Sequence, residues 1–196
     1  MPDDAGMGTI TVEQIVSADG FAVGPGGDLA FFDAVDHHDD DRTDSTQLRW
    51  LETVDAVLLG RTTYEMFAAY WPMADFGAEA VADPISRLPK HVVSSTIERA
   101  PWGDGEIEVL RDGPVAAARS MRERYGSTVV WGSLDLADAL LEAGLVDELR
   151  LRIVPVLVGS GRGFTPASLG TRRLTLREVE QHGSGHVTLV YGVHPA

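Results

Sequence analysis

The segment Gly60-Arg61-Thr62 combines the residue types of an anion-binding site. It follows an apolar run at residues 56–59, typical of a buried strand, and precedes a sequence that suits a helix. The N–H groups and dipole of a helix N-terminus favour a phosphate, a glycine lets the backbone approach it, and an arginine can bind it bidentately. A lone motif of this kind equally fits a buried strand that ends in a surface arginine, so other segments must decide.

A second strand-glycine-helix junction lies at Gly132-Ser133. It follows the β-branched run at residues 127–131, and Ser133 is a favourable cap for a helix that Gly144 ends. Two helix N-termini can each take one end of a diphosphate. The pair of junctions therefore predicts a pyrophosphate better than either junction alone.

Hydroxyl groups form a third candidate site at Ser94 and Ser95, followed by Thr96. They end a predicted strand that begins at Lys90, and the end of a strand suits a phosphate or ribose contact. The alternative is a capped turn.

The run from Asp36 to Asp44 contains His37, His38 and further aspartates, which are possible metal ligands. Contiguous residues on one loop seldom converge on a single ion. We therefore expect a solvated acidic loop and no resident metal.

The composition of the 196-residue chain restricts its function further. The absence of cysteine excludes disulfides, thiolate metal sites and a cysteine nucleophile. A formal net charge of −14 argues against nucleic acid or an anionic membrane as partner. No stretch approaches the roughly 20 apolar residues of a membrane span and the N-terminus does not resemble a signal peptide, so we expect a cytoplasmic protein.

Residues 1–8 are expected to form a flexible leader, and residues 9–196 a single domain. Strands alternate with helices up to about residue 158, and two alternating segments, 174–179 and 186–193, then predict a hairpin. This order indicates an α/β fold: a mostly parallel central sheet with helices on both faces and a C-terminal antiparallel hairpin. Ligands of such sheets bind beyond the carboxyl ends of the strands, where all three candidate segments fall.

Two element boundaries follow from local signals. Ser45 or Thr46 is predicted to cap a helix, and residues 149–158 form the longest apolar strand candidate. The glycine loop at 159–164 after that strand looks superficially like a dinucleotide fingerprint. Its third glycine comes one residue early and Pro166 interrupts the required helix, so we expect a loop bordering the ligand site or a simple crossover.

The order and spacing of several motifs resemble the dihydrofolate reductase superfamily, and most closely the C-terminal reductase domain of the bifunctional riboflavin-biosynthesis deaminase/reductase. The resemblance covers residues 8–193 and rests on Ser17-Ala18-Asp19-Gly20, Gly60-Arg61-Thr62-Thr63-Tyr64-Glu65, Val93-Ser94-Ser95-Thr96, Gly132-Ser133, Gly144 to Leu149 and Pro155 to Gly161.

This resemblance implies an NADPH-dependent reductase. By similarity, Arg61 and Thr62 lie near the adenosine phosphates, Ser94 and Ser95 near the 2′-phosphate, and Gly132 with Ser133 against the pyrophosphate. Residues 19–29 match the mobile flap over the nicotinamide.

One position departs from the folate-reducing enzymes. Their helix before the Gly-Arg-Thr junction carries an acidic residue that holds the pterin, and Gln47 occupies that position here. A neutral amide can hydrogen-bond a heterocycle but does not stabilise its protonated form as a carboxylate does. The substrate is therefore not necessarily folate.

The sequence leaves several candidates for the group that donates a proton to the substrate. Asp19 and Asp28, beside the glycine-rich flap, are the first carboxylates to test, and Tyr64 is a possible substrate contact. Each aspartate equally fits a turn residue that bonds nearby N–H groups, and water can deliver the proton.

Three hypotheses follow. The first is an NADPH-dependent oxidoreductase acting on a small heterocyclic or carbonyl-bearing substrate. The second makes the reaction specific, as reduction of a ribosylated aminopyrimidine in riboflavin synthesis. The third is a nucleotide-binding protein without turnover. The family resemblance also implies a homodimer.

Overall fold

The computed structural model describes residues 7–33, 41–75 and 79–194; for residues 33 and 41–44 it describes the backbone alone. The helices are α1 (Asp41–Leu51), α2 (Arg61–Tyr70), α3 (Ala82–Arg87), α4 (Gly113–Arg124) and α5 (Leu134–Glu142). The strands are β1 (Thr9–Ser17), β2 (Phe21–Val23), β3 (Ala56–Gly60), β4 (Lys90–Val93), β5 (Pro101–Trp102), β6 (Gly105–Glu106), β7 (Glu108–Leu110), β8 (Ser127–Trp131), β9 (Glu148–Val154), β10 (Arg162–Gly163), β11 (Leu174–Gln181) and β12 (Val187–Val193).

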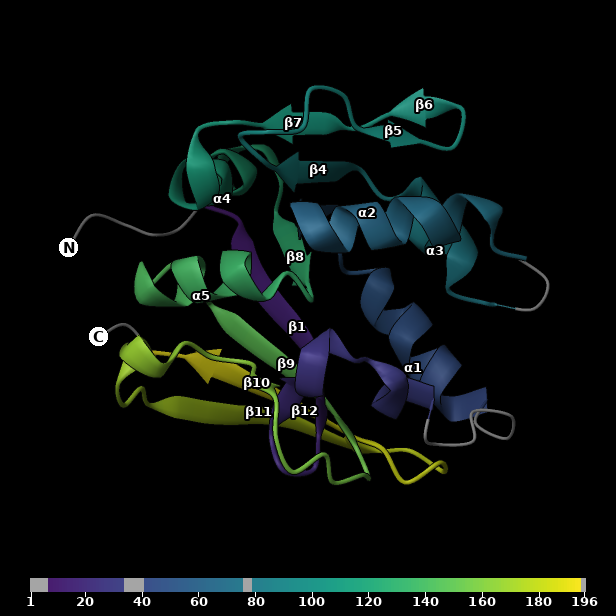
Figure 1. Cartoon of the computed structure of the whole chain (residues 1–196), viewed down its shortest axis with the longest axis vertical. Helices are drawn as coiled ribbons and strands as arrows, with labels where there is room; N and C mark the ends of the chain where they lie inside the picture. Colours follow the sequence, from purple (N-terminus) through teal and green to yellow (C-terminus); the bar gives the residue numbers. More distant parts are fainter. Residues whose placement is uncertain (1–6, 34–40, 76–78, 195–196) are drawn as a thin grey trace.

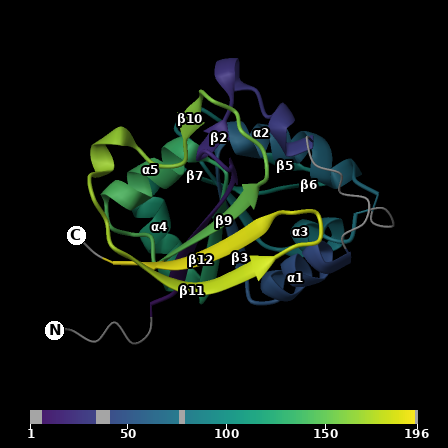
Figure 2. The same ribbon diagram turned by 90° about the horizontal axis from the view of Figure 1, so that it is seen from below.

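Eight strands form the central sheet in the order β11-β12-β9-β1-β8-β3-β4-β7. The strands from β9 to β7 in this order are parallel, whereas β12 runs antiparallel to β9 and pairs with β11 as a hairpin. Figure 2 shows this hairpin along one edge of the sheet, with β9 beside it. The predicted fold class is confirmed.

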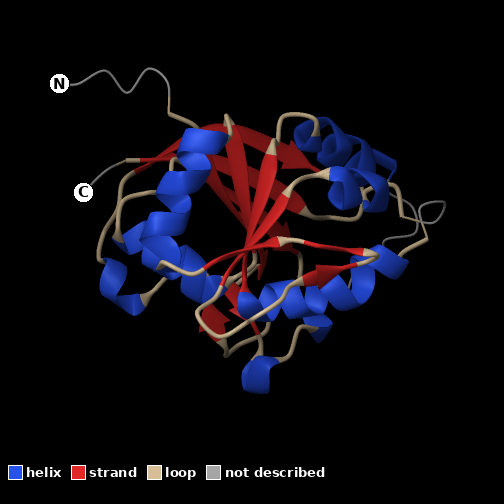
Figure 3. Ribbon diagram, turned by 90° about the horizontal axis from the view of Figure 1, so that it is seen from above, coloured by secondary structure: helices blue, strands red, loops and turns tan. Residues whose placement is uncertain are grey.

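Helices cover both faces of the sheet (Figures 1 and 3). Alternate residues of each strand point to opposite faces, so β3 contributes Ala56 and Leu58 to the core under α4 and α5, and Val57 and Leu59 to the core under α1, α2 and α3. Apolar side chains surround these residues in both cores. Rigid packing on each side thereby fixes where the strand ends lie.

Three boundaries differ from the sequence prediction. Strand β9 ends at Val154 because Pro155 has no N–H to continue the ladder, so the expected strand over 149–158 is too long. Strand β4 ends at Val93, which leaves the following hydroxyl residues in a turn. Helix α1 already includes Asp41, so Ser45 and Thr46 lie inside the helix and do not cap it.

From Gly8 onward, the N-terminal segment is hydrogen-bonded to the rest of the domain. The N–H of Gly8 donates to the carbonyl of Arg122 at 2.9 Å, although we assigned Gly8 to the leader. Residues 1–6 of that leader lie outside the described part. No helix among the described residues is long and apolar enough to cross a membrane.

Candidate active site

The two glycine junctions touch each other at the carboxyl ends of β3 and β8. The N–H of Gly60 donates to the hydroxyl oxygen of Ser133 at 2.8 Å, and the N–H of Ser133 donates to Oγ1 of Thr63 at 2.9 Å. Gly132 and Ser133 both adopt left-handed backbone angles, with φ of 52° and 50°. These contacts place the start of α5 beside the start of α2.

The N-termini of α2 and α5 have no side-chain cap. Gly60 precedes α2 and has no side chain, and the hydroxyl of Ser133 accepts from Gly60 instead of capping α5. The predicted capping role of Ser133 is therefore wrong, because the contact between the junctions uses its oxygen. The first N–H groups of both helices consequently lack a side-chain acceptor and are available to an anion.

Arg61 and Thr62 are exposed in the first turn of α2. The Arg61 guanidinium forms no ion pair or hydrogen bond with another described residue. An unpaired arginine beside two uncapped helix starts provides the charge-assisted hydrogen bonds that a phosphate needs.

The serine segment has one buried and one exposed hydroxyl. The Oγ of Ser94 accepts from the N–H groups of Thr96, at 3.2 Å, and Ile97, at 3.1 Å, which is the geometry of a capped turn. Ser95 is exposed. A phosphate contact from this segment stays a prediction, and Ser95 has the freer side chain to make it.

Asp19 anchors the loop that follows β9. Its carboxylate accepts from the Ser17 hydroxyl at 2.6 Å and from the N–H groups of Val158 and Gly159 at 3.1 and 2.7 Å. These bonds, that of Ser17 first, lower the pKa of Asp19. An ionised, fully bonded carboxylate is a poor proton donor at neutral pH, so the geometry favours the structural alternative for Asp19.

The glycine-rich flap is paired with the loop at 159–163. Strand β2 of the flap and the short β10 form a two-stranded antiparallel sheet. Asp28 is exposed, and its Oδ1 accepts from the N–H of Ala30 at 2.8 Å, as in a turn. Arg162 joins this unit to α5 through Asp135 and Asp138, both at 2.8 Å, and a place for the 159–163 loop beside the ligand stays a prediction.

Gln47 is 8% exposed and lies in a polar cluster under α1. Its Oε1 accepts from Arg150 at 2.8 Å, and its Nε2 lies 3.5 Å from Oε1 of Glu13. Glu13 and Arg150 are not among the site residues predicted from the sequence. The signal was available, because charged residues are unusual inside central strands that are otherwise apolar.

Tyr64 lies in the core under α2. It is buried, and its hydroxyl donates to the carbonyl of Pro101 at 2.8 Å. Burial, followed by the charge of Glu65, raises the pKa of Tyr64. The side chain already has a protein partner, so its role as a substrate contact stays a prediction.

Residues 36–40 of the predicted acidic loop lie outside the described part, whereas residues 41–44 belong to α1, so the loop prediction is wrong for these four residues. Among the described residues, no group of three or more His, Asp or Glu side chains is arranged to hold a metal ion.

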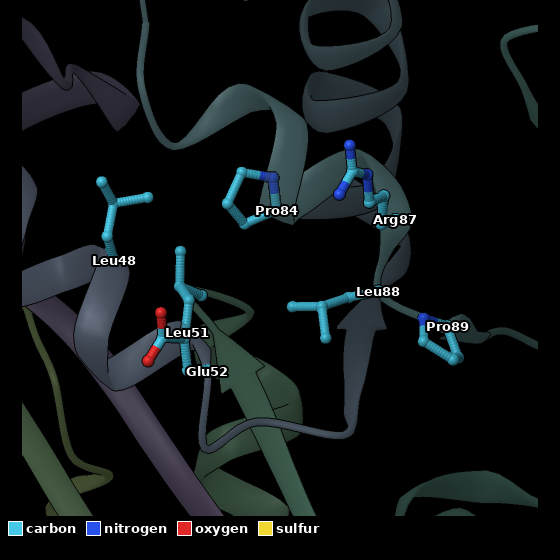
Figure 4. A pocket seen from close by; sticks show the side chains of 7 residues that line it. All are labelled: Leu48, Leu51, Glu52, Pro84, Arg87, Leu88 and Pro89. Atoms are coloured by element: carbon cyan, nitrogen blue, oxygen red, sulfur yellow. The ribbon is translucent and has the colours of Figure 1, made fainter.

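Two hollows lie away from the glycine junctions. An apolar groove of about 360 Å³ between α1 and α3 (Figure 4) is lined by Leu48, Leu51, Glu52, Pro84, Arg87, Leu88 and Pro89. A cavity of about 440 Å³ lies beside α5 and includes Asp147 and His194. Pro89 directly precedes β4 and Asp147 directly precedes β9, so both hollows belong to the opposite, N-terminal ends of the parallel strands.

Comparison with known proteins agrees with this architecture. The protein YyaP of Bacillus subtilis, itself uncharacterised, is 26% identical over 195 residues, covering 93% of each chain. A solved Shewanella sp. PV-4 protein named for riboflavin biosynthesis has a TM-score of 0.75 at 18% identity, covering 95% of this chain and 99% of that one. Dihydrofolate reductase of Enterococcus faecalis has a TM-score of 0.57 at 15% identity, covering 96% and 98%.

The structural neighbours share the dihydrofolate reductase-like fold. The family model described as the RibD C-terminal domain matches residues 8–188, which is nearly the whole chain. This protein therefore belongs to the RibD C-terminal domain family.

Proposed function

We propose that this protein is an NADPH-dependent reductase of a small heterocyclic or carbonyl-bearing substrate. The observation that carries the proposal is the contact between Gly60 and Ser133, which brings two uncapped helix N-termini together beside the unpaired Arg61. The family match supports a reductase, and the Enterococcus neighbour was solved with NADP(H).

The residues at the strand ends fit the phosphates of this cofactor. Gly60, Gly132 and Ser133 would receive the pyrophosphate, because no side chain caps the helix N–H groups beside them. Arg61 and Thr62 would contact adjoining phosphates, and Ser95 with Ser94 the 2′-phosphate. The overall acidic charge makes these few groups decisive for an anionic ligand.

The cofactor supplies a hydride, and the protein orients the substrate and excludes water. Asp19 would hold the flap closed over the site through its bonds to the loop after β9. Asp28, exposed beside the flap, or solvent would then provide the proton that the reduced substrate takes up. Gln47, which faces Arg150 and Glu13, would lie on the substrate side.

The family description favours one specific second candidate, reduction of a ribosylated aminopyrimidine in riboflavin synthesis. Oxidation of NADPH by that substrate, but not by simple carbonyl compounds, would select it. Binding of NADPH without consumption by any candidate would leave a nucleotide-binding protein instead.

We further propose a cytoplasmic homodimer with a small-molecule substrate and no nucleic-acid or membrane partner. The exposed apolar residues Leu174, Leu176 and Val179 on edge strand β11 support a contact between two copies. Sedimentation over a range of concentrations tests this, and a monomer throughout would contradict it.

Substitution of Arg61 by alanine tests the cofactor site. We expect NADPH binding to weaken by roughly 1.5–3 kcal/mol, the scale of one or two charge-assisted hydrogen bonds. Arg119→Ala is the matched control, because Arg119 is an exposed arginine on α4 and makes the same change in net charge. Equal NADPH affinity in both variants would remove Arg61 from the site.

A further inference from the structure

Glu13, Trp131 and Arg150 project from one face of three adjacent strands. Glu13 of β1 is in register with Trp131 of β8 on one side and with Arg150 of β9 on the other. Residues in register on neighbouring strands point to the same face of a sheet. Helix α1 covers this face with Gln47 and Trp50.

These five side chains form one cluster, and Arg150 also lies 3.8 Å from the carboxylate of Glu180 on β11. Glu13 is 5% exposed and Arg150 is 2% exposed, and the two form an ion pair. The indole N–H of Trp131 donates to Oε1 of Glu13 at 3.1 Å. The Arg150 guanidinium lies 4.4 Å from the centre of the Trp50 ring and donates to Gln47.

A contribution to stability does not by itself explain why Glu13 and Arg150 form a buried ion pair. Removing two charges from water costs several kcal/mol per ion, and well-packed apolar residues often stabilise a core as well or better. The apolar core on both sides of this cluster shows that such packing is available in this chain. Buried charges in this position are therefore candidates for a functional role.

The cluster is directly connected to the glycine junction. The backbone carbonyl of Glu13 accepts from the N–H of Gly132 at 3.2 Å, and the side-chain amide of Gln14 donates to the carbonyl of Gly132. Trp131 precedes Gly132 in the chain, and the Phe67 ring lies 6.0 Å from the Trp131 ring. Aromatic rings thus adjoin the charged pair on the side of the proposed cofactor site.

We propose that Glu13, oriented by Arg150, is the carboxylate that contacts the substrate, in place of the acidic residue that α1 lacks at Gln47. The inference rests on the proposed reductase function and names its specificity-determining group. The carboxylate accepts a ring N–H and the guanidinium donates to an adjacent carbonyl. The pair therefore selects a flat ring in which N–H and C=O are neighbours.

The contact between Gln47 and Glu13 is the one that a substrate replaces. At 3.5 Å it is the longest contact of the carboxylate and the weakest by geometry, whereas the Trp131 indole also donates to Oε1 and Arg150 pairs with Oε2. An incoming ring takes the place of the Gln47 amide at both groups, with its N–H at Glu13 and its carbonyl at Arg150, and leaves the ion pair intact. This keeps the buried charges compensated while substrate binds.

The experiment uses 2-pyridone, a flat ring with one N–H beside one carbonyl, and N-methyl-2-pyridone, which lacks the N–H. Each is titrated into the protein with NADP⁺ present, while the indole N–H signals of the four tryptophans are followed by NMR. We expect 2-pyridone to shift the Trp131 signal saturably and to bind about tenfold more tightly than its N-methyl form, the value of one hydrogen bond to a charged group. Equal affinities, or no shift of the Trp131 signal, would overturn the proposal.

Glu13→Gln removes the charge with little change of shape and should reduce this tenfold preference, because a neutral amide oxygen accepts the ring N–H more weakly than a carboxylate does. Asp147→Asn is the control, because Asp147 also pairs with a buried arginine, Arg122, at 2.6 Å, but at the opposite end of the sheet. It should keep the preference. A preference retained in full by a folded Glu13→Gln variant would refute the role of Glu13.

Gln47→Ala supplies an independent test if Glu13→Gln does not fold. It leaves the ion pair intact and removes the competing amide, so 2-pyridone should bind more tightly than to the wild type. Unchanged or weaker binding would count against the proposal. NADPH affinity is measured in parallel. If the wild-type protein does not bind NADPH, the reductase function is refuted. If it binds NADPH but shows none of the pyridone effects, only the role of Glu13 is refuted.

Discussion

Lys90, the single lysine of the chain, should make the stability of this protein rise with pH in the alkaline range. Its side chain is 6% exposed, and its ammonium donates to the carbonyls of Ser86 at 3.0 Å and Leu88 at 2.7 Å. The Trp102 ring lies 4.7 Å from the nitrogen, and no described carboxylate forms an ion pair with it. Burial lowers the pKa of Lys90 from 10.5 to about 8.

The sign follows from proton counting. Between about pH 8 and pH 10.5 the unfolded chain keeps the proton on Lys90 while the folded protein loses it, so the free energy of unfolding increases with pH. Each pH unit in this range adds up to about 1.4 kcal/mol, and because Lys90 is only half deprotonated at about pH 8, the rise between about pH 8 and pH 9.5 is about 1.6 kcal/mol. Tyr64 and Tyr70 have raised pKa values and begin to oppose this only above about pH 10.

Urea unfolding followed by tryptophan fluorescence at several pH values measures this rise. Lys90→Met keeps the length of the side chain and removes its charge, so the variant should lose the rise. All other titrating groups are common to both proteins and cancel in the difference. Parallel profiles for the two proteins, or a wild-type stability that falls over this range, would refute the reasoning.

Two further substitutions test how the flap is held. Asp19→Ala should release the N–H groups of Val158 and Gly159, which faster hydrogen exchange at those two amides would report; unchanged exchange would exclude Asp19 as the anchor. Gly161→Ala should destabilise the protein by about 1–3 kcal/mol, because the new Cβ would lie 2.0 Å from the carbonyl oxygen of Val23. Gly159→Ala, at a positive φ with open space around it, should cost only about 1 kcal/mol, and an equal loss in both variants would contradict the clash.

The arrangement of strands and helices was predictable from the sequence because local patterns determine it. Apolar runs that end at Gly60 and Gly132 mark buried strands, and the alternation after residue 174 marks the hairpin. The end of β9 was misplaced because an apolar pattern continues past Pro155, where the hydrogen-bonded ladder cannot.

The polar cluster under α1 was not predictable in the same way. Glu13 and Arg150 are 137 residues apart, and only the register of β1 with β9 brings them together. The role of Ser133 was not predictable for the same reason. Its sequence position suits a helix cap, but its hydroxyl oxygen accepts a hydrogen bond from the N–H of Gly60, which is distant in sequence. Contacts between distant segments decide which local preference prevails.

Titration of the purified protein with NADPH and with NADH tests the central claim most directly. Nicotinamide fluorescence excited through the tryptophans reports binding. We expect saturable binding with a preference for NADPH, because an arginine and hydroxyl groups adjoin the proposed phosphate sites at Arg61 and Ser95. If neither nucleotide binds, the contact between the glycine junctions serves the fold alone and the reductase assignment is wrong.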